Sequence, residues 1–177
     1  MTALTFANAR IVRADRVESG DLHVRDGVIV DRAAPDATVV DCGGRLLAPG
    51  IVDLGVFAID RAAFRAGGIV RVALMPDQSP VLDDPGIVQR ASLVGKPDLW
   101  IHPLAAATRG LAGQDLAEMA IMRDAGAKAV ATGRGWIGDS GVMRRVLAYA
   151  RDLGLTVIAH AEDAGLTGAA VRTYSIA

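Results

Sequence analysis

From Pro49 onward, short apolar runs alternate with segments of helical periodicity, and this alternation constrains the fold more than any other feature of the chain. The runs are almost continuously apolar, which is typical of strands that are covered on both faces. Apolar strands that alternate with helices indicate βα units and a parallel sheet. The five predicted strands are residues 51–57, 69–75, 100–105, 128–131 and 155–160.

The predicted helix at residues 140–153 has the clearest pattern. Val142, Val146 and Ala150 recur at a spacing of four, so that they share one face of a helix. Asp139 or Ser140 can cap its first N–H groups, and Gly154 can take the left-handed position after its last turn. Further helices are predicted at residues 85–95, at about 115–125, and over a short segment at 61–66.

The number of βα units bears on the architecture. A closed (β/α)8 barrel needs roughly 250 residues, and the part of the chain after Pro49 is much shorter than that. We therefore predict an α/β fold that is an incomplete (β/α)8 TIM barrel of about five βα units. An open doubly wound sheet is the alternative.

Residues 1–48 have a different pattern. Short apolar runs flank Asp26-Gly27, a dipeptide that favours a tight hairpin turn because glycine accepts a positive φ. A second turn signal, Gly43-Gly44, follows the apolar pair Val39-Val40. We predict a small N-terminal β-domain at residues 1–48 and a partial barrel domain at residues 49–177.

Composition excludes several classes of function. With 19 basic and 20 acidic residues the chain has no charge excess that would attract nucleic acid or an anionic membrane. No run of about 18 apolar residues is free of charges, and the first residues do not resemble a secretory signal, so we expect a cytoplasmic protein. Cys42 is the only cysteine, which excludes an intrachain disulfide and a zinc site built from cysteines.

Five short motifs follow one another along the chain. They are Leu-Ala-Pro-Gly-Ile-Val-Asp at residues 47–53, Met-Pro-Asp-Gln-Ser-Pro-Val-Leu-Asp at 75–83, the segments 108–111 and 116–119, Gly-Val-Met-Arg-Arg at 141–145, and His-Ala-Glu-Asp at 160–163. In order and separation, over about residues 1–171, they resemble the dihydroorotase family. This family belongs to the amidohydrolase superfamily, together with the allantoinases and hydantoinases.

The resemblance implies a metallo-dependent hydrolase barrel with zinc at the ends of its strands, but several positions depart from it. In the family, Asp53 would begin an Asp-x-His-x-His motif, and this chain has Gly55 and Phe57 at the two histidine positions. Neither side chain offers the imidazole, thiolate or carboxylate that zinc requires. At the end of the fourth strand the family supplies an Asp or a carboxylated Lys, whereas residues 131–133 are Ala-Thr-Gly.

His160 is the only histidine at a matching ligand position, because His23 lies in the β-domain and His102 lies within a strand. A catalytic zinc needs about three protein ligands. We interpret His160 as a vestigial, single metal-ligand position, where a histidine kept for packing or hydrogen bonding is favoured over one that binds metal. No catalytic residue is assigned and no bound cofactor is expected, although zinc serves the family.

Asp77 stands where the family has a substrate-binding Asn, so it is a candidate for substrate binding. A carboxylate would repel an anionic substrate such as dihydroorotate, however, so we favour a structural role in the turn before Pro80.

The sequence thus predicts a dihydroorotase-like protein of pyrimidine biosynthesis that is C-terminally truncated. It is predicted to be non-catalytic, a pseudoenzyme that has lost its zinc site. The resemblance implies aspartate transcarbamoylase as a partner, since non-catalytic homologues support the assembly of that enzyme. An open barrel edge also predicts self-association. Two alternatives stay open: a cyclic amidohydrolase with an atypical metal site, and a truncated remnant without function.

Overall fold

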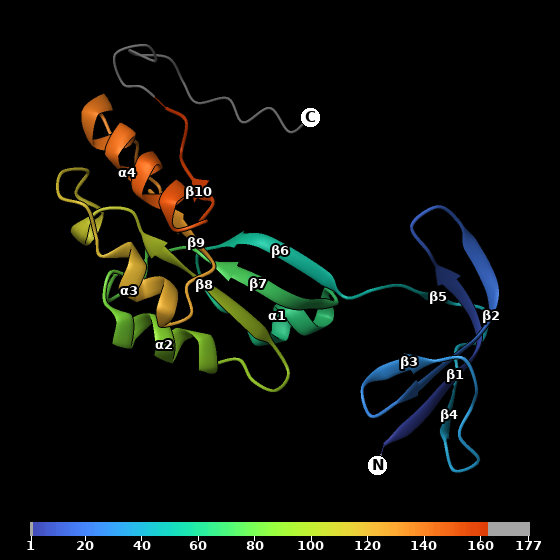
Figure 1. The fold of residues 1–177 in the computed structure, drawn as a ribbon. Helices are drawn as coiled ribbons and strands as arrows, with labels where there is room; N and C mark the ends of the chain where they lie inside the picture. Colours follow the sequence, from blue (N-terminus) through green and yellow to red (C-terminus); the bar gives the residue numbers. More distant parts are fainter. Residues whose placement is uncertain (1, 163–177) are drawn as a thin grey trace. The chain divides into compact units, whose positions relative to one another are not determined.

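The computed structural model describes residues 2–162. The chain divides after Gly50 into two compact units. The first unit is a five-stranded sheet in the order β3-β2-β1-β4, with β5 paired to β1. Asp26 and Gly27, both with positive φ, form the tight turn that joins β2 to β3, as predicted from the sequence. The strands are β1 (Ala3–Val12), β2 (Val17–Arg25), β3 (Val28–Val30), β4 (Thr38–Asp41) and β5 (Leu46–Leu47) (Figure 1).

The second unit contains a parallel sheet in the order β10-β9-β8-β7-β6, so that each strand lies beside its neighbour in sequence. Consecutive βα units produce this order, and it confirms the predicted partial barrel rather than the doubly wound alternative. The strands are β6 (Ile51–Val56), β7 (Ile69–Leu74), β8 (Trp100–Ala106), β9 (Ala129–Ala131) and β10 (Val157–Ile158).

Four helices follow the strands and lie along one side of the sheet (Figure 1). Asp60, Asp84 and Asp139 precede three of them, and each carboxylate accepts a hydrogen bond from a first-turn N–H group. Gly154, with a φ of +68°, follows the last helix. The helices are α1 (Arg61–Ala66), α2 (Pro85–Leu93), α3 (Met119–Asp124) and α4 (Ser140–Asp152), with a short 3-10 turn, η1, at Arg109–Leu111.

The helix predicted at about 115–125 begins later than expected. Residues 115–117 run beside the exit of β8 instead, where Arg109 N–H donates to the Asp115 carbonyl and Ala117 N–H donates to the Ala107 carbonyl. Leu116 also forms a β-bridge with Thr108. These backbone bonds compete with the first helical turn, so α3 begins only at Met119.

The two faces of the parallel sheet are packed differently. On the outer face, Val72 and Leu74 of β7 pack with Val88 of α2, and Val130 of β9 packs with Val146 of α4. Burying one such side chain contributes roughly 1.5–3 kcal/mol, so this face supplies most of the unit's hydrophobic stabilisation. The inner face has a smaller apolar cluster, formed by Met75, Leu104, Ala129 and Ala131 with Ala73 and Ile158 beside them.

Among residues 2–162, no helix is long and apolar enough to cross a membrane.

Candidate functional site

The carboxyl ends of parallel strands meet at one edge of the sheet, and in barrel enzymes the active site lies there. Five residues follow the five strands at this edge: Phe57 after β6, Asp77 after β7, Thr108 after β8, Thr132 after β9 and His160 after β10. We call this set the carboxyl-end edge. With Gly55, which lies just before the end of β6, it contains the positions at which the sequence suggested a ligand or a substrate contact.

At the end of β6, the two positions expected to hold histidines carry no metal-binding group. Gly55 N–H donates to the Asp53 carboxylate over 3.0 Å. Phe57 is 36% exposed, and the guanidinium carbon of Arg134 lies 3.9 Å from the centroid of its ring. A cation over an aromatic face at an exposed site contributes about 0.5–1 kcal/mol. A fixed positive charge from the loop after β9 therefore covers the end of the first barrel strand.

Asp77 holds that loop in place. Its Oδ1 accepts a hydrogen bond from the backbone N–H of Arg134 over 2.9 Å. Gly133, with a φ of +75°, lets the loop pass close to the carboxylate, because a Cβ there would come within 2.8 Å of Asp77 Oδ1. The Oδ2 atom is buried and has no hydrogen-bond partner among the described residues. The Asp77 side chain thus bonds to a loop distant in sequence, and not within the local turn before Pro80.

Two further side chains tie neighbouring loops together. Gln78 donates from Nε2 to the carbonyls of Phe57 and Met75, over 3.2 and 3.0 Å, and so joins the ends of β6 and β7. Asp83 accepts from the backbone N–H of Gly110 over 2.7 Å, which joins the loop after β7 to the loop after β8. Both residues lie in the 75–83 motif, but their contacts with Phe57 and Gly110 could not be predicted from it, because these partners are 21 and 27 positions away.

His160 is engaged in hydrogen bonds. Its backbone N–H donates to Thr132 Oγ1 over 3.1 Å, and its Nε2 lies 2.7 Å from Glu162 Oε2. Thr132 is 4% exposed, so the hydroxyl at the fourth-strand position is buried beneath this contact. Alcohols are poor zinc ligands compared with imidazole or carboxylate. His160 and Thr132 therefore form a structural link between β9 and β10.

The other two histidines lie elsewhere. His23 is in β2, where its Nδ1 lies 3.0 Å from Thr5 Oγ1. His102 is in β8, with its Nε2 3.4 Å from Arg71 Nη1. Partial burial, together with the positive charges of Arg71 and Lys128, holds the pKa of His102 below its ordinary value.

The residues present do not fit the zinc that the fold family uses. Glycine and phenylalanine at the end of β6, a buried threonine at the end of β9 and a guanidinium over the Phe57 ring leave His160 as the only imidazole at this edge. Within residues 2–162, no three His, Cys, Asp or Glu side chains are grouped so that they could hold a metal ion. One imidazole with one nearby carboxylate falls short of the three protein ligands of a catalytic zinc site.

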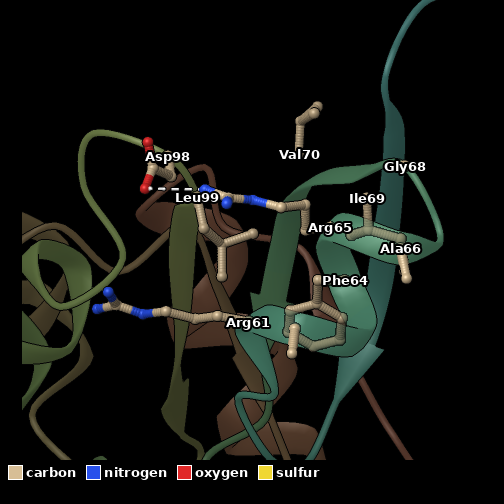
Figure 2. A pocket seen from close by; sticks show the side chains of 10 residues that line it. Arg61, Phe64, Arg65, Ala66, Gly68, Ile69, Val70, Asp98 and Leu99 are labelled. Carbon is tan, nitrogen blue, oxygen red and sulfur yellow. Dashed lines mark hydrogen bonds and ion pairs between the residues drawn. The ribbon is translucent and has the colours of Figure 1, made fainter.

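A separate cleft of about 760 Å³ lies at the opposite end of the strands (Figure 2). It is lined by α1 and by residues that precede or begin β7 and β8, including Phe64, Ile69 and Leu99. Arg65 and Asp98 form an exposed ion pair at its rim, 3.5 Å apart. Such pairs contribute about 0–1 kcal/mol. Because its lining residues lie at the starts of β7 and β8, the cleft is not at the carboxyl-end edge, where barrel enzymes bind their substrates.

Known proteins share both the fold and the sequence pattern of this chain. The structure matches an L-hydantoinase of Arthrobacter aurescens with a TM-score of 0.71 and 21% sequence identity, over 92% of this chain and 41% of that one. The chain is 36% identical to a dihydroorotase of Pelotomaculum thermopropionicum over 176 residues. It is 34% identical to a dihydroorotase of Geobacter sp. strain M21 over 170 residues. No protein-family model matches the chain.

The alignments cover most of this chain but less than half of each relative. They span 89% and 85% of the chain, and 41% and 40% of the two dihydroorotases. The fold is a partial barrel like that of the L-hydantoinase. The sequence comparisons show that the chain belongs to the dihydroorotase family.

Proposed function

We propose that this chain is a non-catalytic, dihydroorotase-like protein of pyrimidine biosynthesis, a pseudoenzyme that acts through binding to another protein. One observation carries the proposal. At the end of β6, where the family resemblance expects two zinc-binding histidines, the chain has Gly55 and Phe57, and the Arg134 guanidinium covers the Phe57 ring. A zinc ion brought to this place would meet a positive charge and no ligand from positions 55 and 57.

The site lacks the means by which a zinc hydrolase activates water. In zinc hydrolases the metal lowers the pKa of a bound water to about 7, which supplies hydroxide at neutral pH. The groups at the carboxyl-end edge cannot replace this function. Asp77 is occupied by the Arg134 N–H, and His160 is occupied by Glu162. The other Asp77 oxygen, Oδ2, is buried, and His160 Nε2 is paired with Glu162, so neither side chain presents a free group to a ring amide in solvent.

The proposed partner is aspartate transcarbamoylase, the enzyme that the family resemblance implies. The chain spans about two fifths of the length of the dihydroorotases that it matches, 41% and 40% in the two comparisons above. In the described residues, β6 and β10 lie at the two edges of the sheet and each pairs on one side only. Unpaired strand edges favour association with another chain, either a partner or a second copy.

The catalytic part of the proposal is tested with a turnover assay. The full chain is incubated with zinc and dihydroorotate at several pH values, with the Pelotomaculum dihydroorotase as the positive control. We expect no turnover above the rate without protein. Turnover that is proportional to chain concentration and is abolished by His160→Ala would instead establish a cyclic amidohydrolase with an atypical metal site.

The partner is tested with aspartate transcarbamoylase from the same source. The two proteins are expressed together, and the complex is sought by size-exclusion chromatography with light scattering. We expect co-elution and a higher thermal midpoint for the transcarbamoylase, because a ligand that binds only the folded state stabilises it. Separate elution with no change in the midpoint would contradict this partner. A sharp cooperative transition from a monomeric chain would contradict self-association through the open edges.

A further inference from the structure

The inner face of the parallel sheet carries a group of cations around one tryptophan. Arg71 of β7 lies opposite Trp100 of β8 in the strand register, and its guanidinium is 5.2 Å from the ring centroid. The Lys96 ammonium lies 5.0 Å from the same centroid. His102 is two residues further along β8, and Lys128 adds a second positive charge near its ring. We call these five residues the inner-face cluster.

The position of the cluster follows from strand alternation. Val72 and Leu74 of β7 and Ile101 of β8 pack in the helix-covered core, so their neighbours Arg71, Trp100 and His102 point to the other face. Leu104, two residues beyond His102, joins the inner apolar cluster with Met75, which agrees with this assignment. Arg71 and His102 are therefore on the face that a closed barrel would enclose, and Lys96 is beside them because its ammonium lies over the Trp100 ring.

The cluster is largely exposed to solvent. Trp100 is 43% exposed, and Arg71, Lys96 and Lys128 are also in the exposed class. Among residues 2–162, no acidic side chain forms an ion pair with any of these three cations. Cations enclosed without a partner are unfavourable, so whatever covers this face has to bring carboxylates or comparable anions.

We infer that the inner face is a docking surface for an acidic segment of a partner protein. The inference deepens the proposed function, on which its biological purpose rests, by naming the surface and the charge of the partner. The cations are interspersed with apolar side chains such as Ala73 and Leu104, and a polypeptide can supply both apolar and carboxylate groups at that spacing. The ring of Trp100 already contacts two cations and is not free to stack a nucleic-acid base.

Two other occupants are disfavoured by charge. A second copy of the chain would present the same cations to the same face, and like charges in an interface repel. Residues 163–177 contain one acidic residue, Asp163, and one basic residue, Arg172, so they bring no net negative charge. An acidic partner is the occupant that the described side chains complement.

The test uses Trp100 as its own reporter. The full chain contains two tryptophans, so Trp136→Phe leaves Trp100 as the only one. An extended peptide that alternates Glu and Val is titrated into this variant while the fluorescence is followed, at low and at high salt. A Lys-Val peptide of equal length and a single-stranded oligothymidylate serve as the comparison probes.

We expect the Glu-Val peptide to change the Trp100 emission saturably, with weaker binding at high salt because exposed charges are screened. Arg71→Glu and Lys128→Glu should each weaken binding by about tenfold or more. Arg144→Glu, an exposed arginine on α4, is the matched control and should bind like the parent. If a Glu variant loses its far-ultraviolet circular dichroism, Arg71→Met and Lys128→Met replace it, with a smaller loss of the same sign.

Three results would overturn the inference. They are no binding of the Glu-Val peptide, equal binding by all variants, and binding of the oligothymidylate that is as tight as that of the peptide and competes with it. The last result would assign the surface to a nucleic acid. None of these results depends on zinc, on turnover or on aspartate transcarbamoylase, so failure here is distinguishable from failure of the proposed function.

Discussion

The helix-covered face of the parallel sheet and the carboxyl-end edge of the same strands differ in what their residues can do. On the covered face, Val72, Val88 and Val146 are fully buried and pack as strands and helices of a barrel require. At the carboxyl-end edge, Phe57 and Thr132 stand where the family resemblance expects metal ligands. A fold depends on many apolar positions, whereas a metal site depends on three or four specific side chains. The first can persist where the second is absent.

The largest expected effect is on stability, and it comes from the helix-covered face. Met122 of α3 is fully buried, while its neighbour Ile121 on the same helix is 50% exposed. Met122→Ala should lower the free energy of unfolding by about 2–5 kcal/mol, since it leaves a cavity in the helix-covered core. Ile121→Ala, the control, should change it by about 0.5 kcal/mol or less. Urea denaturation measures both, and equal losses would show that the covered face does not hold the unit together.

The Asp77 contact has a smaller expected effect. Asp77→Ala removes the acceptor for the Arg134 N–H and should lower the free energy of unfolding by about 1–3 kcal/mol. Asp77→Asn retains an oxygen at that position and serves as the control, with a smaller loss. If the alanine variant were as stable as the parent in urea, Asp77 would not be holding the loop after β9.

The contact between Arg134 and Phe57 should contribute less to the free energy of unfolding than Asp77 does. Arg134→Met, Phe57→Leu and the double variant form a double-mutant cycle, and the coupling free energy should be about 0.5–1 kcal/mol. A coupling of zero would mean that the guanidinium does not rest on the ring in solution, and that the end of β6 is open.

His102, on the inner face of the sheet, should make the free energy of unfolding depend on pH. Burial, Arg71 and Lys128 lower the pKa of His102 from its ordinary value of 6.5. A lowered pKa in the folded state gives a stabilisation that is present above pH 6.5 and is lost as the pH falls through the folded value. Titration of the His102 ring by nuclear magnetic resonance should show this low pKa, and Lys128→Met should raise it. An unchanged pKa in that variant would show that Lys128 does not act on His102.

The pattern of strands and helices was largely predictable, because apolar spacing encodes which face of each element is buried. The short helix at residues 61–66 and the turn at Asp26-Gly27 were found from local signals alone. The start of α3 was missed because backbone bonds from Arg109 and Ala117 join this segment to the exit of β8. No local signal in the sequence records such a pairing.

The carboxyl-end edge was predictable only in part. The residue types at 55, 57 and 132 could be read directly, and they already indicated the missing ligands. The position of Arg134 over Phe57 could not be read, since the two residues are joined only by the order of strands in the sheet. The same holds for the bond from Arg134 to Asp77, which spans 57 positions in sequence.

The central claim is that the carboxyl-end edge does not hold a catalytic zinc ion. The most direct measurement is the zinc content of the full chain, by elemental analysis after expression with added zinc and dialysis against metal-free buffer. The Pelotomaculum dihydroorotase, treated in parallel, is the comparison. We expect far less than one zinc ion per chain, unchanged by His160→Ala. A full zinc ion per chain that is lost in His160→Ala would contradict the claim.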